Sequence, residues 1–368
     1  MRRRSILLAG LLIAAALVVL AWVAVARFGP ALSLSLALAA PSAEPWVSRV
    51  LSPPIREEIT LATESGQLQA DLYWPARPRG ALLLVHGLSR AGRRQPDLER
   101  LARLLGQHGV IVVVPQFEGL AAFRLGGREV EDIRSALGYT ATLDGSVGIA
   151  GFSFGAGPAL LAAAGVPGLR VVGSFGGYAD LHHVIRYVTT GEYDFEGRRY
   201  VQRQEEYNRW KLLALLVGLI EGAEDRRLLD GIAQRKLVNP GDDTGAMEAA
   251  LGPEGRAALA LVLNRQDDAV DDLIGRLPVG ARDALRRLSP LPAVPHISAS
   301  LLVAHGTADD SIPFTESLRL AAAGRGRAHL ALFETFHHTG PQAFWPSLRQ
   351  RAGDGWKLMV VAEELLGR

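Results

Sequence analysis

The chain contains no cysteine among its 368 residues. This absence excludes disulfide bonds, thiolate catalysis and cysteine-based metal sites. An excess of charge of one sign is also missing, because 40 Lys and Arg residues stand against 38 Asp and Glu residues. No basic stripe interleaved with aromatic residues runs along the sequence, so we expect no nucleic-acid partner. An apolar content of 48% over this length suffices for one large domain with an insertion, or for two domains.

A long apolar run lies at the N-terminus. Three arginines, Arg2–Arg4, precede the stretch Ile6–Ala26, which holds no charged residue. About 20 apolar residues at about 1.5 Å each span roughly 30 Å, the thickness of a bilayer core. Because basic residues stay on the cytoplasmic side, we expect residues 1–27 to form a single-pass membrane anchor. The rest of the chain would then lie on the extracytoplasmic side, in a bacterial periplasm or at the cell surface.

A cleaved signal peptide is the alternative for this run. The apolar core of a signal peptide is usually shorter, about 7–15 residues. The small residues Ala37–Ala40 would nevertheless suit a signal peptidase. The proline-containing residues 28–54 show no periodic pattern and are predicted to be a linker between anchor and domain.

From residue 55 onward, short apolar strands alternate with amphipathic helices. An antiparallel pair is predicted at 55–62 and 68–74, and the strands expected after it are 81–85, 110–115, 147–150 and 169–175. Helical patterns separate several of these strands. The alternation predicts an α/β fold with a mostly parallel central sheet and helices on both faces.

The alternation stops after residue 180. Residues 181–295 show helical patterns punctuated by prolines and glycines, and no convincing buried strand. Strands return near 298–304 and 329–333. We therefore expect a helical cap, 181–295, inserted into a core built from 55–180 and 296–368. The very apolar segment 210–220 is predicted to pack inside this cap, with an acyl-binding pocket or contact with lipid as the alternative.

Residues 151–155 read G-F-S-F-G, a G-x-S-x-G motif with Ser153 at its centre. A buried strand is predicted before the motif, and small apolar residues, 156–164, follow it. A sharp turn between strand and helix would expose the serine hydroxyl for attack on a substrate, and the glycines leave room for its backbone. We predict a nucleophile elbow, and the alternative is a glycine-rich turn with an idle serine.

Three more motifs follow predicted strands. His86-Gly87 ends one strand, a G-x-x-D-x-x-I-P segment carries Asp309 after another, and an F-x-H-x-x-P segment carries His338 after the last. The active sites of open parallel sheets lie at this carboxyl end of the strands. With its Ser, Asp and His in this order, the chain resembles the α/β-hydrolases from about residue 59 to the C-terminus.

The resemblance implies a catalytic triad. Ser153 would be the nucleophile, and a histidine must take its proton because a serine hydroxyl is otherwise a poor nucleophile. The spacing favours His338 as this base over its neighbour His337. Asp309 would orient the imidazole and stabilise its charged form.

Other residues compete for these roles or support them. Asp310 and Asp180 are alternatives to Asp309, and Asp180 equally suits the N-cap of the first cap helix. The oxyanion hole is expected to use the backbone N–H groups of Leu88 and Phe154. His86 is expected to be a structural histidine under the site.

No cofactor is implied, and we expect no metal. The adjacent pair His182-His183 points in two directions on a helix, and no carboxylate pattern completes a site. The expected protein is a serine hydrolase, similar to carboxylesterases or lipases, that cleaves a small-molecule or lipid-like ester or thioester through an acyl-enzyme. The alternatives are an acyltransferase or a peptidase on the same fold, and a non-catalytic, membrane-anchored binding module.

Overall fold

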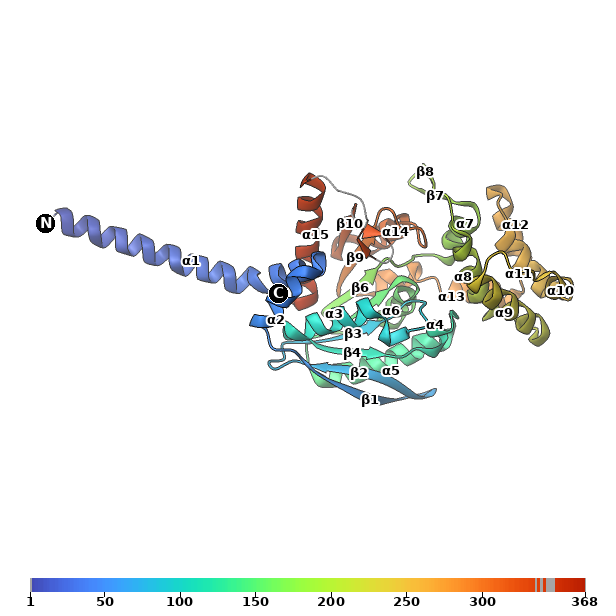
Figure 1. Ribbon diagram of the computed structural model, residues 1–368, viewed down its shortest axis with the longest axis horizontal. Helices are drawn as coiled ribbons and strands as arrows, with labels where there is room; N and C mark the ends of the chain where they lie inside the picture. Colours follow the sequence, from blue (N-terminus) through green and yellow to red (C-terminus); the bar gives the residue numbers. More distant parts are fainter. Residues whose placement is uncertain (1, 335, 338–339, 342–347, 368) are drawn as a thin grey trace.

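A computed structural model describes residues 2–334, 336–337, 340–341 and 348–367, with side chains for 18–20, 22–334 and 353–367. Its centre is an eight-stranded sheet of order β1-β2-β4-β3-β5-β6-β9-β10 (Figure 1). The strands are β1 (Ile55–Thr63), β2 (Gly66–Trp74), β3 (Ala81–Val85), β4 (Ile111–Pro115), β5 (Val147–Phe152), β6 (Val171–Phe175), β9 (Ser300–Gly306) and β10 (Ala328–Phe333). β2 runs antiparallel to both of its neighbours, and the strands from β4 to β10 run parallel. The predicted mostly parallel sheet is confirmed.

Helices cover both faces of this sheet, as the alternating pattern predicted. Side chains point alternately to the two faces of a strand. In β3, Leu82 and Leu84 belong to one buried apolar cluster and Leu83 to the other. The first cluster includes residues of α3 (Pro96–Gln107) and α15 (Leu348–Leu366), and the second includes residues of α5 (Gly127–Leu143), α6 (Ala156–Ala163) and α14 (Thr315–Gly324). Burial on both faces explains why the central strands are continuously apolar.

A helical insertion, residues 181–296, lies between β6 and β9. It contains α7 (Leu181–Thr190), α8 (Glu206–Val217), α9 (Ala223–Val238), α10 (Gly245–Ala249), α11 (Pro253–Leu263), η4 (Asp267–Ala269), α12 (Val270–Gly275), α13 (Val279–Arg287) and η5 (Leu291–His296). Trp210 and Leu213 of α8 are buried, which confirms the predicted packing of this segment inside the insertion. The helical patterns did not predict the hairpin of β7 (Glu192–Phe195) and β8 (Arg198–Val201), where Tyr193 stacks on Tyr200 with ring centroids 5.1 Å apart.

The N-terminal helix α1 (Arg2–Ala39) projects from the domain on the side opposite the insertion (Figure 1). Among the residues searched, 18–39 are apolar and long enough to cross a membrane by length and composition. Residues 28–54, expected to be a linker, contain the last turns of α1, then η1 (Pro41–Ala43) and α2 (Glu44–Val50). Ala31, Leu34 and Ala37 are fully buried. Their spacing of three residues places them on one helix face, which packs onto the domain.

The remaining short elements connect these parts. They are η2 (Gly92–Arg94), α4 (Glu118–Ala121), η3 (Ser153–Gly155), η6 (Arg325–Arg327), and the two-residue strands β11 (Phe336–His337) and β12 (Gly340–Pro341).

Candidate active site

Ser153 lies on a sharp turn between β5 and α6, as the motif predicted. Its backbone has φ = +52°, in the left-handed region. Holding a residue other than glycine in this region costs about 1–3 kcal/mol of stability. Such strain persists only where the surrounding structure imposes it. The turn therefore holds Ser153 at the carboxyl edge of the sheet at a cost in stability, which is the geometry of a nucleophile elbow.

Two glycines of the motif are required by close backbone packing. A Cβ on Gly151 would lie 2.5 Å from the Ala156 Cα, and a Cβ on Gly155 would lie 2.1 Å from the His86 carbonyl oxygen. Both distances are far below van der Waals contact. Gly151 thus allows the turn to pack against the start of α6, and Gly155 allows it to pack against the loop that follows β3.

The loop after β3 reaches the serine itself. A Cβ on Gly87 would lie 2.8 Å from the Ser153 Cβ, so only glycine fits between the two segments. Leu88 follows directly and is half-buried. Its amide and that of Phe154, the residue after the serine, are the two groups expected to form the oxyanion hole.

His86 holds the loop after β3 through hydrogen bonds to the backbone. Its Nε2 accepts a hydrogen bond from the Phe117 N–H at 3.0 Å, and its Nδ1 lies 2.9 Å from the Gly87 carbonyl oxygen. An Nε2 that accepts must be unprotonated, so Nδ1 carries the proton and donates it to Gly87. Burial lowers the pKa of His86 to about 4. The residue is neutral at physiological pH and supports the loop, consistent with the expected structural role.

The low pKa of His86 predicts a pH-dependent stability. Between about pH 6.5 and pH 4 the unfolded chain protonates this imidazole and the folded chain does not, so acid favours unfolding. We expect His86 to account for about 3 kcal/mol of lost unfolding free energy between pH 7.5 and pH 4. Denaturant titrations of the protein and of His86→Gln across this range measure the difference. Parallel profiles for the two proteins would contradict the assignment.

The Asp309 carboxylate, the predicted acid, is buried and accepts two backbone hydrogen bonds. Its side chain is 1% exposed, and Oδ1 accepts hydrogen bonds from the N–H groups of Ser311 at 2.8 Å and Ile312 at 3.0 Å. Oδ2 lies 3.3 Å from the Nε2 of His305. These contacts fix the plane of the carboxylate. The side chain of Asp310, the alternative, accepts a hydrogen bond from the Ser311 hydroxyl at 3.3 Å.

The insertion holds the loop that carries Asp309. The Tyr187 hydroxyl of α7 donates to the Asp309 carbonyl oxygen at 2.7 Å, and the Asn208 amide of α8 donates to the Asp310 carbonyl oxygen at 2.8 Å. Lys211 of α8 lies 3.3 Å from the Ser311 hydroxyl, and burial lowers its pKa. Sequence reasoning missed these supports because no motif marks them.

The structure describes little of the two histidines that are candidates for the base. His338 lies outside the described residues, and only the backbone of His337 is described, in β11, which lies beside β9. β10 ends at Phe333, at the sheet edge where Ser153 and Asp309 also lie. The choice between the two histidines stays a prediction.

Asp180 and the adjacent pair His182-His183 form hydrogen bonds or ion pairs with groups outside the candidate triad. Asp180 is the N-cap of α7, and its side chain accepts a hydrogen bond from the His182 N–H at 2.8 Å. His182 and His183 pair with different acids, Asp271 at 3.0 Å and Glu316 at 3.1 Å. The N-cap interpretation of Asp180 is thereby confirmed.

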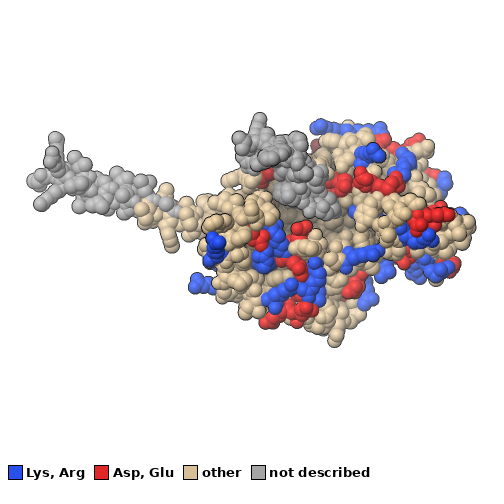
Figure 2. Space-filling model, in the orientation of Figure 1, with Lys and Arg blue, Asp and Glu red and all other residues tan. Residues whose placement is uncertain are grey.

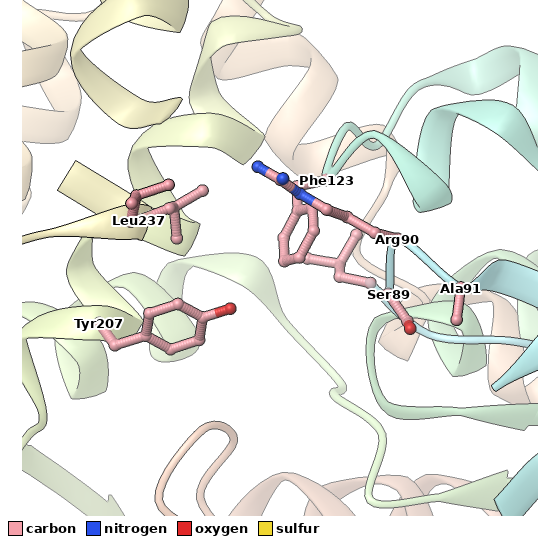
Figure 3. Close-up of a pocket in the computed structure, with 8 residues that line it drawn as sticks. Ser89, Arg90, Ala91, Phe123, Tyr207 and Leu237 are labelled. Carbon is pink, nitrogen blue, oxygen red and sulfur yellow. The ribbon is translucent and has the colours of Figure 1, made fainter. Parts of the chain in front are cut away.

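A pocket of about 430 Å³ opens between the loop after β3 and the insertion (Figure 3). It is lined by Leu88, Ser89, Arg90, Ala91, Phe123, Tyr207, Leu237 and Val238. Arg90 also donates to the Gln234 side-chain oxygen of α9 at 2.6 Å, which ties the core to the insertion. The sequence did not predict this pocket, because its walls come from segments far apart in the chain.

No protein-family model matches the chain, and no curated protein matches it. Solved structures do. An α/β hydrolase from Penicillium sp. sh18 matches with a TM-score of 0.50 and 16% identity, over 85% of this chain and 98% of that one. The esterase domain of a Rhodothermus marinus protein matches with a TM-score of 0.45 and 15% identity, over 84% and 96%. A Pyrococcus horikoshii acylaminoacyl peptidase matches with a TM-score of 0.49 and 13% identity, over 88% of this chain but 43% of that one.

At these identities the likeness shows the fold alone. The sheet order, the turn at Ser153 and the match to the Penicillium hydrolase together establish that the chain has the α/β-hydrolase fold. This chain spans less than half of the peptidase it resembles.

Proposed function

We propose that the protein is a serine hydrolase that cleaves a carboxylic ester or thioester through an acyl-enzyme. The observation that carries the proposal is the strained backbone of Ser153, at φ = +52°, with Gly87 packed against its Cβ. Backbone strain of this kind clusters at active sites, and here it holds a half-buried serine at the carboxyl edge of the sheet. The α/β-hydrolase fold supports the same reaction class but does not by itself specify a function.

In the proposed mechanism, His338 takes the proton of the Ser153 hydroxyl as the oxygen attacks the substrate carbonyl carbon. The tetrahedral oxyanion accepts hydrogen bonds from the Leu88 and Phe154 amides. His338 then protonates the leaving group, and the same histidine activates the water that releases the acyl group. Asp309 holds the histidine in the tautomer that accepts the serine proton.

The pocket beside Leu88 is the proposed site for one part of the substrate. Leu88 links the pocket wall to an expected oxyanion donor, and the rest of the wall mixes apolar residues with Arg90 and Tyr207. A volume of about 430 Å³ suits a small ester rather than a polymer. A series of p-nitrophenyl esters of increasing chain length measures its depth directly.

Labelling by a fluorophosphonate tests the proposed function. The probe forms a covalent adduct only with an activated serine hydroxyl. We expect one adduct per chain, located on the peptide that contains Ser153 by mass spectrometry. No adduct, or an adduct on another serine, would overturn the proposal.

The adjacent histidines offer a matched pair of variants. We expect His338→Ala to lower kcat by about 10³-fold or more, because the serine loses its base. His337→Ala is expected to change kcat less than about tenfold. Steady-state hydrolysis of p-nitrophenyl acetate compares them. The reverse ranking would transfer the role of base to His337.

We also propose that residues 6–26 anchor the protein in a membrane, with the catalytic domain on the extracytoplasmic side. The uncharged run behind three arginines supports this placement. Carbonate washing of membranes from expressing cells, followed by protease protection, tests it.

A further inference from the structure

The end of the proposed anchor is part of the folded domain. Ala31, Leu34 and Ala37 of α1 share a buried cluster with Leu358 and Val361 of α15. Arg27 pairs with Glu363 of α15 at 2.9 Å, and the Ser33 hydroxyl lies 3.0 Å from the Nε2 of His108. Cleavage after Ala40 would remove these buried side chains, so the packing favours a retained helix. It also leaves no flexible tether between residue 26 and the domain.

This attachment lies at the amino-terminal edge of the sheet. His108 precedes β4, and Arg170, which precedes β6, donates to the Leu365 carbonyl oxygen at 3.1 Å. The Ser300 hydroxyl, at the start of β9, donates to Glu364 of α15 at 3.1 Å. Ser153 follows the carboxyl end of its strand. Five-residue strands separate the two edges by about 16 Å, at roughly 3.3 Å per residue.

The amino-terminal edge is rich in exposed arginines. Arg77 and Arg79 precede β3, and Arg325 and Arg327 precede β10. Three acids lie near this edge. Glu363 is paired with Arg27, whereas Glu364 and Asp144 accept hydrogen bonds from neutral groups, the Ser300 hydroxyl and the Ser146 N–H at 2.8 Å, and keep their charge. Figure 2 shows Lys and Arg atoms at the end of the domain from which α1 leaves. Anionic lipid headgroups attract basic groups close to a membrane span, so this edge suits an extracytoplasmic leaflet that contains anionic lipid.

We propose that the amino-terminal edge of the sheet, with its four exposed arginines, rests on the anionic surface of the bilayer that α1 crosses. A helix that continues without a break from the bilayer into the domain holds this orientation. The candidate active site then opens away from the membrane, so its substrate arrives from the aqueous phase. The inference rests on the proposed anchor and not on the proposed ester hydrolysis.

The absence of native cysteine allows a direct test in the full-length protein. Gly326, between two of the edge arginines, and Gly275, at the end of α12 in the insertion, are both exposed, and a Cβ at either would meet no atom within 4 Å. Gly326→Cys and Gly275→Cys, each labelled with a small fluorophore, are reconstituted in phosphatidylglycerol–phosphatidylcholine vesicles that contain a headgroup-nitroxide lipid.

We expect the nitroxide to quench the probe at position 326 roughly threefold or more above the probe at position 275, with less difference in phosphatidylcholine alone. Adding Arg325→Gln and Arg327→Gln to the Gly326→Cys protein should reduce its quenching. Equal quenching at the two positions, or stronger quenching at 275, would overturn the orientation. Loss of the protein from washed vesicles would overturn the anchor on which it rests. Fluorophosphonate labelling on the same vesicles reports hydrolase chemistry separately.

Discussion

Replacing Ser153 with alanine is expected to lower kcat for ester hydrolysis by about 10³-fold or more and to abolish fluorophosphonate labelling. The proposed acyl-enzyme forms on this hydroxyl, and no other group of the elbow can carry the acyl chain. Alanine keeps the Cβ that packs on Gly87 and keeps a side chain at φ = +52°, so the turn should retain its shape. Steady-state hydrolysis of p-nitrophenyl esters and in-gel labelling measure the two effects.

Ser153→Gly is the matched control for folding. It also lacks the hydroxyl, but glycine adopts a positive φ without strain, so we expect the variant to be inactive and about 1 kcal/mol more stable. Denaturant titration records the gain. Substantial hydrolysis by Ser153→Ala, after a contaminating esterase has been excluded with a second purification, would refute the proposed nucleophile.

Asp309→Asn is expected to lower kcat by about 10³–10⁴-fold. The amide that replaces the carboxylate cannot stabilise a positively charged imidazole and favours the wrong tautomer of the base. The amide oxygen still accepts the Ser311 and Ile312 N–H groups, so the loop should keep its conformation. The kcat of the variant, measured with the same esters, is compared with that of the parent protein.

Asp310→Asn is the matched control because it makes the same change one residue away. The Asp310 side chain contacts the Ser311 hydroxyl, and its backbone carbonyl, which the substitution leaves in place, accepts from Asn208. We expect its kcat to stay within about threefold of the parent. Comparable losses for the two variants would indicate a general effect on the loop. A loss confined to Asp310→Asn would move the acid to that residue.

The elbow could be predicted from sequence because its causes are local. The motif glycines are required by atoms a few residues away, as with Gly151 against Ala156, and by one loop whose own His-Gly signal is visible after β3. Alternating strands and helices predicted the mostly parallel sheet for a similar reason. The central strands β3, β4, β5, β6 and β9 are buried on both faces, so their apolar runs are continuous and short.

Other features depend on contacts between distant segments. The pocket joins the loop after β3 to α8 and α9, and its residues have no shared pattern in the chain. The support of Asp309 by Tyr187 joins residues 122 positions apart. The hairpin of β7 and β8 is held by pairing between its two strands and by the stacking of Tyr193 on Tyr200. Its strands are mostly not buried, so no buried-strand pattern marked them in the sequence.

The sequence by itself predicted the alternation of strands and helices in the core and the sharp turn at Ser153, because burial patterns and short-range sterics specify them. Asp309 as the candidate acid came from its motif and the resemblance to the α/β-hydrolases. Only the tertiary structure decided that residues 28–39 continue α1 into the core and that the anchor and Ser153 occupy opposite edges of the sheet. The reason is geometric. The sequence shows that a helix has an apolar face, but the surface that covers this face is formed by segments that come together only in the folded chain.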